Sequence, residues 1–342
     1  MPERLFTAFW NLENLFAPAD YAARPEWLAR TLRTQLRGWS SALLQHKLKQ
    51  LASIIEQMND GKGPDLLAVC EVENQFVLDE LCALLNERMP QREYQPVHVD
   101  ASRDLRGIDT AFIHDRRVLQ VNRDEIFSHW VIRRTGTRDI TQATFITNSG
   151  AELVALANHW PSRSGDNLGS SSGFRAVAGE TLGYWHERIR DIKGVDAAVI
   201  ALGDFNDDPF DASVIEHARA TRELRDVTRA RSARFYNLSW SYLTQPAVDR
   251  RGRQRTLNGT LYHRGDGHVF DQILVSPGLV KSGGAFRALL QTARIEAFPE
   301  MTDSTASPAP IRFGLPKGNA RKNVNRNGFS DHYPVSLTIE SR

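Results

Sequence analysis

The stretch ALGDFNDDP, residues 201–209, closes an apolar run that begins at Ala197. The polar residues that follow the run are Asp204, Asn206, Asp207 and Asp208. The run predicts a strand buried on both faces, and ligand sites in layered α/β proteins lie just beyond the ends of such strands. Taken alone, the cluster is better explained as a solvated turn, because Gly, Asp, Asn and Pro are ordinary turn residues. The rest of the chain has to decide between the two interpretations.

Composition limits the classes of protein to consider. The 342 residues contain 43 Lys and Arg against 41 Asp and Glu, so a surface that binds polyanions has to be local. Hydrophobic residues at 41% and charged residues at 25% are typical of a soluble globular chain. Cys70 and Cys82 make no metal-ligand pair and are expected to be reduced core thiols. Residues 1–16 lack the pattern of a signal peptide, and no apolar run has the length of a membrane span. We therefore expect a cytoplasmic protein with no membrane partner.

Hydrophobic periodicity alternates between strand and helix patterns along the whole chain, which predicts an α/β protein. Apolar residues spaced by three and four predict helices at 44–58, 77–88 and 178–192. Strands are expected at 5–10, 65–74, 107–115, 152–160, 197–202, 268–276 and 332–340. No linker separates these segments, so we expect one domain over residues 1–342 with loop insertions near 17–40, 229–265 and 296–328.

Six expected strands end in polar residues that suit one kind of chemistry. These residues are Asn11 with Glu13, Glu71, His159, Asp204 with Asn206, Asp271, and Asp331 with His332. Carboxylates and a side-chain carbonyl without thiolates suit a hard divalent cation, Mg²⁺ or Mn²⁺, with Ca²⁺ as a further option. Two histidines suit proton transfer and stabilisation of negative charge near neutral pH. Hydrolysis of phosphate esters needs both kinds of group.

Several of these segments together resemble a known motif series. The segments are FWNLENLF (9–16), LAVCEVEN (67–74), NHWPS (158–162), LGDFNDDP (202–209), FDQILVS (270–276) and FSDHYPVSLTIE (329–340). In this order they resemble the DNase I-like endonuclease/exonuclease/phosphatase superfamily. The resemblance implies a four-layer α/β sandwich, in which two mixed β-sheets pack face to face and helices flank them. It also implies a site where strands of both sheets end.

The resemblance further implies a role for each strand-end residue. The metal site would comprise Asn11, Glu13, Glu71 and Asp331, with Glu71 as the principal carboxylate. His159 would be the general acid, Asp204 would orient the water, and Asn206 would hold the phosphate or the water. Asp271 would orient His332, the last histidine. Arg163 and Arg175 are candidates for a phosphate contact or are solvated charges, and the carboxylate that relatives often place behind the general acid has no secure counterpart.

The catalytic set leaves the substrate open, because members of this fold act on several phosphoesters. Local charge favours a nucleic-acid partner, DNA or RNA, since Arg321, Lys322 and Arg326 directly precede the last motif. A second basic run contains Arg250, Arg251, Arg253 and Arg255, and the aromatic residues Trp39, Trp160, Trp240 and Tyr242 either stack on bases or belong to the core. The alternatives are a phosphatase or lipid phosphodiesterase of the same fold, and an inactive nucleic-acid binding module.

Overall fold

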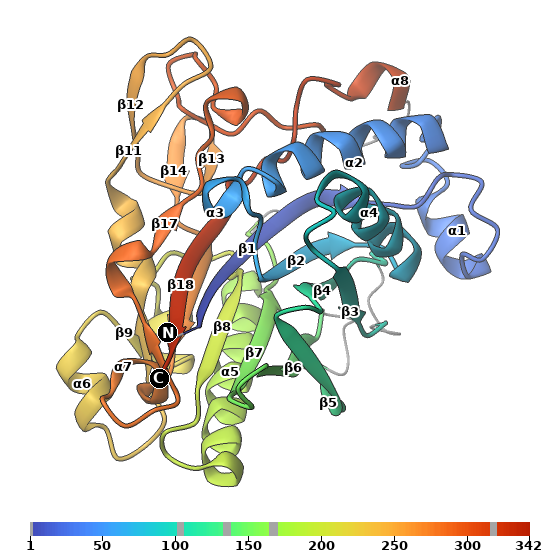
Figure 1. Cartoon of the computed structure of the whole chain (residues 1–342). Helices are drawn as coiled ribbons and strands as arrows, with labels where there is room; N and C mark the ends of the chain where they lie inside the picture. The colour runs from blue at the N-terminus through green and yellow to red at the C-terminus, as the bar shows by residue number, and fades with distance from the viewer. Residues whose placement is uncertain (1–2, 101–105, 133–137, 164–169, 315–319) are drawn as a thin grey trace.

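Two seven-stranded β-sheets pack face to face and helices lie outside them, as Figure 1 shows. The computed structural model describes residues 3–100, 106–132, 138–163, 170–314 and 320–342. The four-layer α/β sandwich expected from the sequence is confirmed.

The first sheet has the order β16-β18-β1-β2-β4-β3, with β17 also paired to β18. Its strands are β1 (Arg4–Leu15), β2 (Leu66–Val72), β3 (Tyr94–His98), β4 (Asp109–Asp115), β16 (Phe286–Ala288), β17 (Arg294–Ile295) and β18 (Val335–Ser341). Strand β1 is parallel to β2 and antiparallel to β18, so the first and last strands of the chain are neighbours. The pairing of β1 with β2 shifts register between Asn11 and Leu15. At this irregularity Glu13 and Asn14 adopt left-handed backbone conformations.

The second sheet has the order β5-β6-β7-β8-β15-β10-β9. Its strands are β5 (Leu119–His129), β6 (Ile140–Thr147), β7 (Glu152–His159), β8 (Val199–Asp204), β9 (Ala220–Thr221), β10 (Phe235–Asn237) and β15 (Asp271–Val275). All six residues of β8 are buried, as the apolar run predicts. Its last residue, Asp204, is paired with His159 of β7 on one side and with Asp271 of β15 on the other. Strand register therefore places three of the predicted site residues side by side.

Helices and short elements complete the layers. Helices α1 (Glu26–Leu32), α2 (Ser41–Ile55), α3 (Met58–Gly61) and α4 (Gln75–Arg88) lie on the side of the first sheet, and α5 (Ser170–Lys193) lies on the other side (Figure 1). The remaining short helices are a π-helix at Ser213–His217, α6 (Leu224–Arg229), α7 (Pro277–Val280), α8 (Ala320–Asn323), and 3-10 turns at Leu238–Leu243, Leu290–Thr292 and Pro299–Met301. Two small hairpins lie between β10 and β15 in the chain. The first pairs β11 (Gln245–Val248) with β12 (Gln254–Leu257), and the second pairs β13 (Leu261–His263) with β14 (Asp266–His268).

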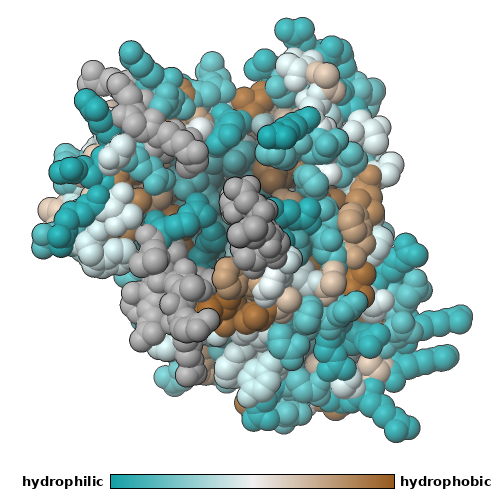
Figure 2. Space-filling model, turned by 180° about the vertical axis from the view of Figure 1, so that it is seen from behind, coloured by the Kyte–Doolittle hydropathy of each residue, from teal (hydrophilic) through white to brown (hydrophobic). Residues whose placement is uncertain are grey.

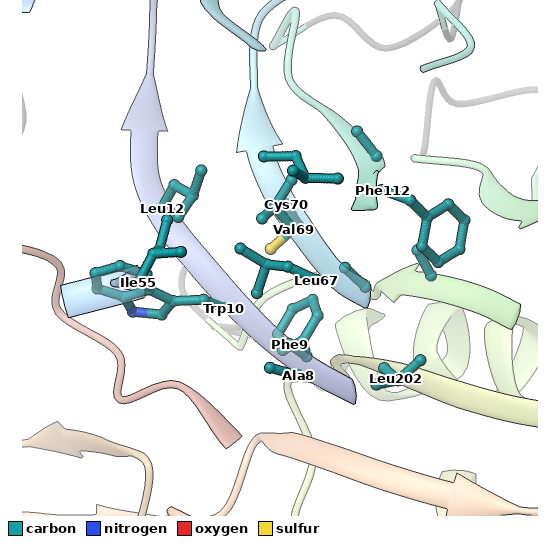
Figure 3. Close-up of a cluster of buried hydrophobic side chains, with 14 of the residues drawn as sticks. Ala8, Phe9, Trp10, Leu12, Ile55, Leu67, Val69, Cys70, Phe112 and Leu202 are labelled. Carbon is teal, nitrogen blue, oxygen red and sulfur yellow. The ribbon is translucent and has the colours of Figure 1, made fainter. Parts of the chain in front are cut away.

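Alternating side chains of β1 fill two different layers of the core, part of which is shown in Figure 3. Phe9 points into the space between the sheets, toward Leu202 of β8, whereas Trp10 points toward Ile55 of α2. Both cysteines are buried and free, as expected, and burial raises the pKa of the Cys70 thiol far above its usual range. Within the residues described, no helix is long and apolar enough to span a bilayer.

The structure corrects several expectations about individual segments. Trp39, Trp160 and Tyr242 are buried, so they belong to the core and cannot stack on bases. The strand expected at 268–276 begins only at Asp271, because His268 ends the β13–β14 hairpin. The insertion at 17–40 contains helix α1, and strands β5 and β6 had no clear signal in the sequence.

One buried histidine should make the fold sensitive to acid. His186 of α5 stacks on Phe235, with ring centroids 3.8 Å apart, and burial lowers its pKa from 6.5 to about 3. The unfolded chain therefore takes up a proton that the folded chain excludes, so the free energy of unfolding falls as pH drops from about 6.5 toward 3.

We predict that His186→Gln removes up to about 1.4 kcal/mol per pH unit from this slope between pH 6 and 4. Urea unfolding at several pH values measures it. His217→Gln, at a side chain that is 40% exposed, is the control and should leave the slope unchanged. Equal slopes for the wild type and the His186 variant would contradict the assignment.

Candidate active site

A cavity of about 520 Å³ opens where strands of both sheets end. Seven of the predicted residues line this site cavity: Glu71, His159, Arg163, Asp204, Asn206, Asp331 and His332. Asn11, Glu13 and Asp271 are almost completely buried and contact the lining residues from behind. The structure thus brings together residues that are up to 321 positions apart, from Asn11 to His332.

Polar contacts join the two sheets at the floor of the cavity. Asn11 Nδ2 of β1 donates a hydrogen bond to Asp204 Oδ2 of β8 at 3.1 Å. His159 Nε2 lies 3.6 Å from Glu71 Oε1 and 3.7 Å from Asp204 Oδ2. Asp204 Oδ1 accepts the backbone N–H of Asn206 at 2.9 Å. Asn206 has a left-handed backbone, and its own amide donates to the Trp160 carbonyl at 2.9 Å.

His332 is held as a charged imidazolium by its neighbours. Its Nδ1 lies 2.8 Å from Asp271 Oδ2, and its backbone carbonyl accepts Trp10 Nε1–H at 2.9 Å. Burial alone lowers the pKa of His332, but the carboxylates of Asp271 and Asp204 outweigh burial, and the pKa lies well above its usual range. The ring therefore carries a proton at neutral pH and presents Nε2 toward Asp204, 3.9 Å away.

His159 is in the opposite state. Burial, together with the positive charges of Arg138 and Arg106, lowers the pKa of His159 well below 6.5. Its Nδ1 is buried and has no hydrogen-bond partner among the described residues. The carboxylate that the sequence left unassigned behind this histidine is therefore absent from the part of the chain that the structure describes. His159 is a neutral imidazole at neutral pH.

Asp204 has a pKa suited to proton transfer. Burial raises the pKa of Asp204 to about 7, and the neighbouring carboxylates of Asp271 and Glu71 add to the rise, while His332 and the Asn206 N–H oppose it. A carboxylate whose pKa lies near the working pH is still partly deprotonated at that pH. It is also a stronger base than an ordinary carboxylate, so it can accept a proton from water. The site thus holds a base, a cation and a neutral imidazole within one cavity.

Glu71 offers one free oxygen to a ligand. Its Oε2 accepts hydrogen bonds from Asn14 N at 2.8 Å and Asn14 Nδ2 at 2.6 Å, which leaves Oε1 facing His159. The remaining amide oxygen, Asn14 Oδ1, is buried without a hydrogen-bond partner among the described residues. Together with the half-buried Asp331, these are oxygen donors only, which fit a hard cation such as Mg²⁺ or Mn²⁺. Asn14 was not recognised from the sequence, although it lies in the motif that contains Asn11.

The other two predicted metal residues are engaged by the protein itself. The amide of Asn11 bonds Asp204 and the Glu13 N–H. One carboxylate oxygen of Glu13 accepts Arg312 Nε at 2.9 Å, and the other accepts the N–H groups of Phe313 and Gly314 at 2.9 and 3.0 Å. Their role as metal ligands stays a prediction. Among the described residues, the one compact group of three acidic or histidine ligands is His98, Asp100 and Asp109, outside the site cavity.

Arg312 and Lys47 complete the surroundings of Glu13. Arg312 lines the site cavity, and its Nη2 lies 2.8 Å from Glu13 and 3.7 Å from Asp331. Lys47 of α2 is fully buried and donates to the Glu13 carbonyl oxygen. A lysine on the apolar face of a helix, three residues after Leu44, was a signal for this contact that sequence reasoning missed.

The predicted substrate-binding residues separate into two groups. Arg163 pairs with Asp207, Asp208 and Asp211, and Arg175 is buried against Asp207 at 2.8 Å. Both arginines therefore stabilise the turn after β8, and Arg163 also lines the site cavity. Lys322 and Arg326 are exposed on the segment that leads into Asp331, and Arg321 lies outside the residues whose side chains are described. In the other basic run, Arg253 and Arg255 pair with Asp249.

Removal of the Asp271 carboxylate should make His332 lose its proton, and with it the positive charge, at a lower pH. We predict that Asp271→Asn lowers the pKa of His332 toward or below 6.5, because burial then acts without its largest compensating charge. NMR titration of the histidine ring protons measures this directly and needs no substrate. Asp124→Asn, the same change at an exposed residue of β5, should leave the titration as in the wild type. An unaltered His332 titration in Asp271→Asn would show that another group holds the charge.

Comparisons with known proteins agree with this fold. A family model described as the Endonuclease/Exonuclease/phosphatase family matches residues 6–341. An endonuclease/exonuclease/phosphatase family protein from Bacteroides thetaiotaomicron has a similar structure, with a TM-score of 0.55, 15% identity, and coverage of 100% of this chain and 99% of that one.

Two further solved structures share the fold. The mannosyl-6-phosphatase of Bacteroides thetaiotaomicron has a TM-score of 0.53 and 16% identity, covering 98% and 99% of the two chains. D. rerio TDP2 humanised by 14 mutations has a TM-score of 0.51 and 15% identity, covering 98% of each chain. A search of curated proteins gave no match. The family model spans nearly the whole chain, and we conclude that the protein belongs to the endonuclease/exonuclease/phosphatase family.

Proposed function

We propose that the protein is a metal-dependent phosphodiesterase that hydrolyses nucleic acid, DNA or RNA. Membership of the family supports phosphoester hydrolysis, and the substrate is our proposal. The observation that carries it is the pairing of a carboxylate of pKa about 7, Asp204, with the imidazolium of His332 in the site cavity. Such a pair can accept a proton from water and stabilise negative charge in one transition state.

Each residue has a defined task in this proposal. Asp204, oriented by Asn11, accepts a proton from the water that attacks phosphorus. Asn206 lines the cavity beside Asp204 and positions the water or a phosphate oxygen. His332, oriented by Asp271, stabilises the negative charge that develops on the departing side, and neutral His159 donates a hydrogen bond there. When bound by Glu71 with Asn14 and Asp331, Mg²⁺ or Mn²⁺ supplies positive charge to the phosphoryl oxygens.

Positive charge at the rim supports a polymer as the substrate. Arg106 and Arg312 line the site cavity, and Lys322 and Arg326 are exposed on the segment just before Asp331. A polyanion crossing the cavity would bring neighbouring phosphates near these cations. A phosphomonoesterase is the second candidate, because the mannosyl-6-phosphatase has a similar fold and the concave cavity suits a small ester as well.

Loss of the Asp204 charge should stop catalysis while leaving the fold intact. We predict that Asp204→Asn lowers turnover of bis(p-nitrophenyl) phosphate with Mn²⁺ by about 10² or more, because general-base help is lost. Asp196→Asn, at an exposed residue just before the opposite end of β8, is the matched control and should keep wild-type turnover. Wild-type hydrolysis that persists in EDTA, or a fully active Asp204→Asn, would contradict the proposed mechanism. Faster hydrolysis of p-nitrophenyl phosphate than of the diester would favour the monoesterase.

Phosphate contacts of Lys322 and Arg326 should appear in the salt dependence of nucleic-acid binding. We predict that Lys322→Ala and Arg326→Ala each reduce the slope of log affinity for duplex DNA against log salt by about 0.9 for each lost phosphate contact. Fluorescence anisotropy of a labelled duplex in EDTA measures the slope. Lys62→Ala, at an exposed lysine before the start of β2, should leave it unchanged. If the two rim variants show the wild-type slope, these cations do not contact phosphates.

A further inference from the structure

A second cavity of about 430 Å³ lies beside the site cavity, and we call it the aromatic cavity. The two are adjacent along two segments of chain. Glu71 lines the site cavity and Glu73 lines the aromatic cavity, two residues further along the same segment. Arg106 lines the first and Gly107 the second. The two cavities therefore border the same two short segments of chain.

Three aromatic side chains from separate segments give the cavity its name. Tyr21 comes from the insertion after β1, Trp27 from α1 and Phe76 from the first turn of α4. Tyr21 and Phe76 stack on one another, with ring centroids 4.9 Å apart and an angle of 23° between the planes. Trp27 is 42% exposed, which leaves much of its indole available to a ligand. In Figure 1, α1 lies past the end of β2, close to α4 and β3.

A buried ion pair fixes the insertion that carries Tyr21. Arg24 Nε lies 2.5 Å from Glu73 Oε1, and both side chains are almost completely buried. The guanidinium also donates to the Ala17 carbonyl at 2.9 Å, while Glu73 accepts the Ala17 N–H at 2.7 Å. Burying two charges has a high desolvation cost that only close geometry offsets. The loop is therefore held in one position at the end of β2, so the cavity is formed before a ligand binds.

Gly107 fixes helix α1 over the same cavity. Its backbone is left-handed, with φ at +61°, and a Cβ atom at this position would lie 2.5 Å from Leu28 Cδ1. Only glycine allows both the conformation and this close approach. Leu28 is buried, so the contact holds the helix that presents the neighbouring Trp27.

The polar groups of the aromatic cavity suit a neutral ring better than a phosphate. His98 Nε2 pairs with Asp109 Oδ2 at 3.1 Å, and Asp100 is an exposed carboxylate nearby. The charge of Arg24 is already balanced by Glu73. Carboxylates repel a phosphate, but they accept hydrogen bonds from exocyclic amino groups. Aromatic faces beside such acceptors are a suitable environment for a nucleobase.

We propose that the aromatic cavity is a subsite that binds a base of the nucleic-acid substrate next to the scissile phosphate, with Trp27 as its stacking platform. This inference rests on the proposed function, because it assigns the base to a strand whose phosphate lies at Glu71 and Asp204. It predicts that the protein recognises a base, and not only the sugar-phosphate backbone.

The test uses the full chain in EDTA, so that binding is measured without cleavage. The probes are fluorescein-labelled single-stranded DNA hexamers, either intact or with one abasic position moved along the strand, and anisotropy gives the affinity. For the wild type, an abasic residue at one position should weaken binding by about 5-fold or more. In Trp27→Ala, the intact hexamer should bind more weakly by a similar factor, and the abasic substitution at that position should then have little effect.

Trp130→Ala is the matched control, because Trp130 is an equally exposed tryptophan (46%) on the segment after β5. It should retain both the affinity and the abasic effect of the wild type. If the wild type cleaves the intact hexamers with Mn²⁺ but binds all abasic hexamers equally, or if Trp27→Ala weakens intact and abasic hexamers alike, the base subsite is overturned and the proposed function stands. If the wild type hydrolyses the small diester but neither binds nor cleaves any hexamer, made as DNA or as the matching RNA sequence, the nuclease proposal and the subsite fail together.

Discussion

The contacts of Asp204 and Asp271 with the opposite sheet are the constraint on which the site depends. Asn11 of β1 reaches Asp204 of β8, and His332, which precedes β18, reaches Asp271 of β15. Each contact joins one sheet to the other, so the face-to-face packing of the two apolar layers sets the distances in the site. Because these groups are buried, a loss of register would leave unpaired charges in the core. The same packing that stabilises the fold therefore also fixes the geometry of the chemistry.

The two histidines show how neighbours can give one residue type two states. His332 has carboxylates on both sides, and its pKa is raised even though it is buried. His159 is buried to a similar degree, and burial, together with the positive charges of Arg138 and Arg106, lowers its pKa. The site thus contains one charged and one neutral imidazole, although both side chains are histidines. This separation follows from strand order, since β15 brings Asp271 to His332, and no described residue places a carboxylate behind His159.

Apolar strands with polar ends give a strong local signal, and from them the sequence predicted an α/β chain, whereas the four layers were predicted from the resemblance of its motifs to a known family. Arg163 and Arg175 show what such reasoning leaves open. The sequence allowed a phosphate contact or a solvated charge for each, and only the structure shows that the turn at Asp207 and Asp208 places carboxylates within reach of both. A sequence does not reveal which of several nearby charges will pair in space. Glu13 is a similar case, because only the structure shows that the distant segment around Arg312 returns to it.

The aromatic cavity could not be predicted for a related reason. Tyr21, Trp27 and Phe76 belong to an insertion and a helix start with no common period. The buried pair of Arg24 and Glu73 and the close contact of Gly107 with Leu28 join these segments, and neither is evident from the sequence. A role in substrate binding for the basic residues before Asp331 stays a prediction, which rests on their position in the chain just ahead of a site residue.

The pairing of β1 with β18 has a consequence for how the chain acquires its structure. Thr7 of β1 donates to the carbonyl of Leu337 of β18, 330 positions later, so the centre of the first sheet closes a very long loop. Contacts between such distant residues form slowly, because the entropy of loop closure has to be overcome before the contact gains any free energy. Until β18 docks, β1 has an unpaired edge that can associate with other chains. The docking of β18 onto this edge also places His332 in the site cavity. Recovery of catalysis after denaturation therefore reports a late step of folding.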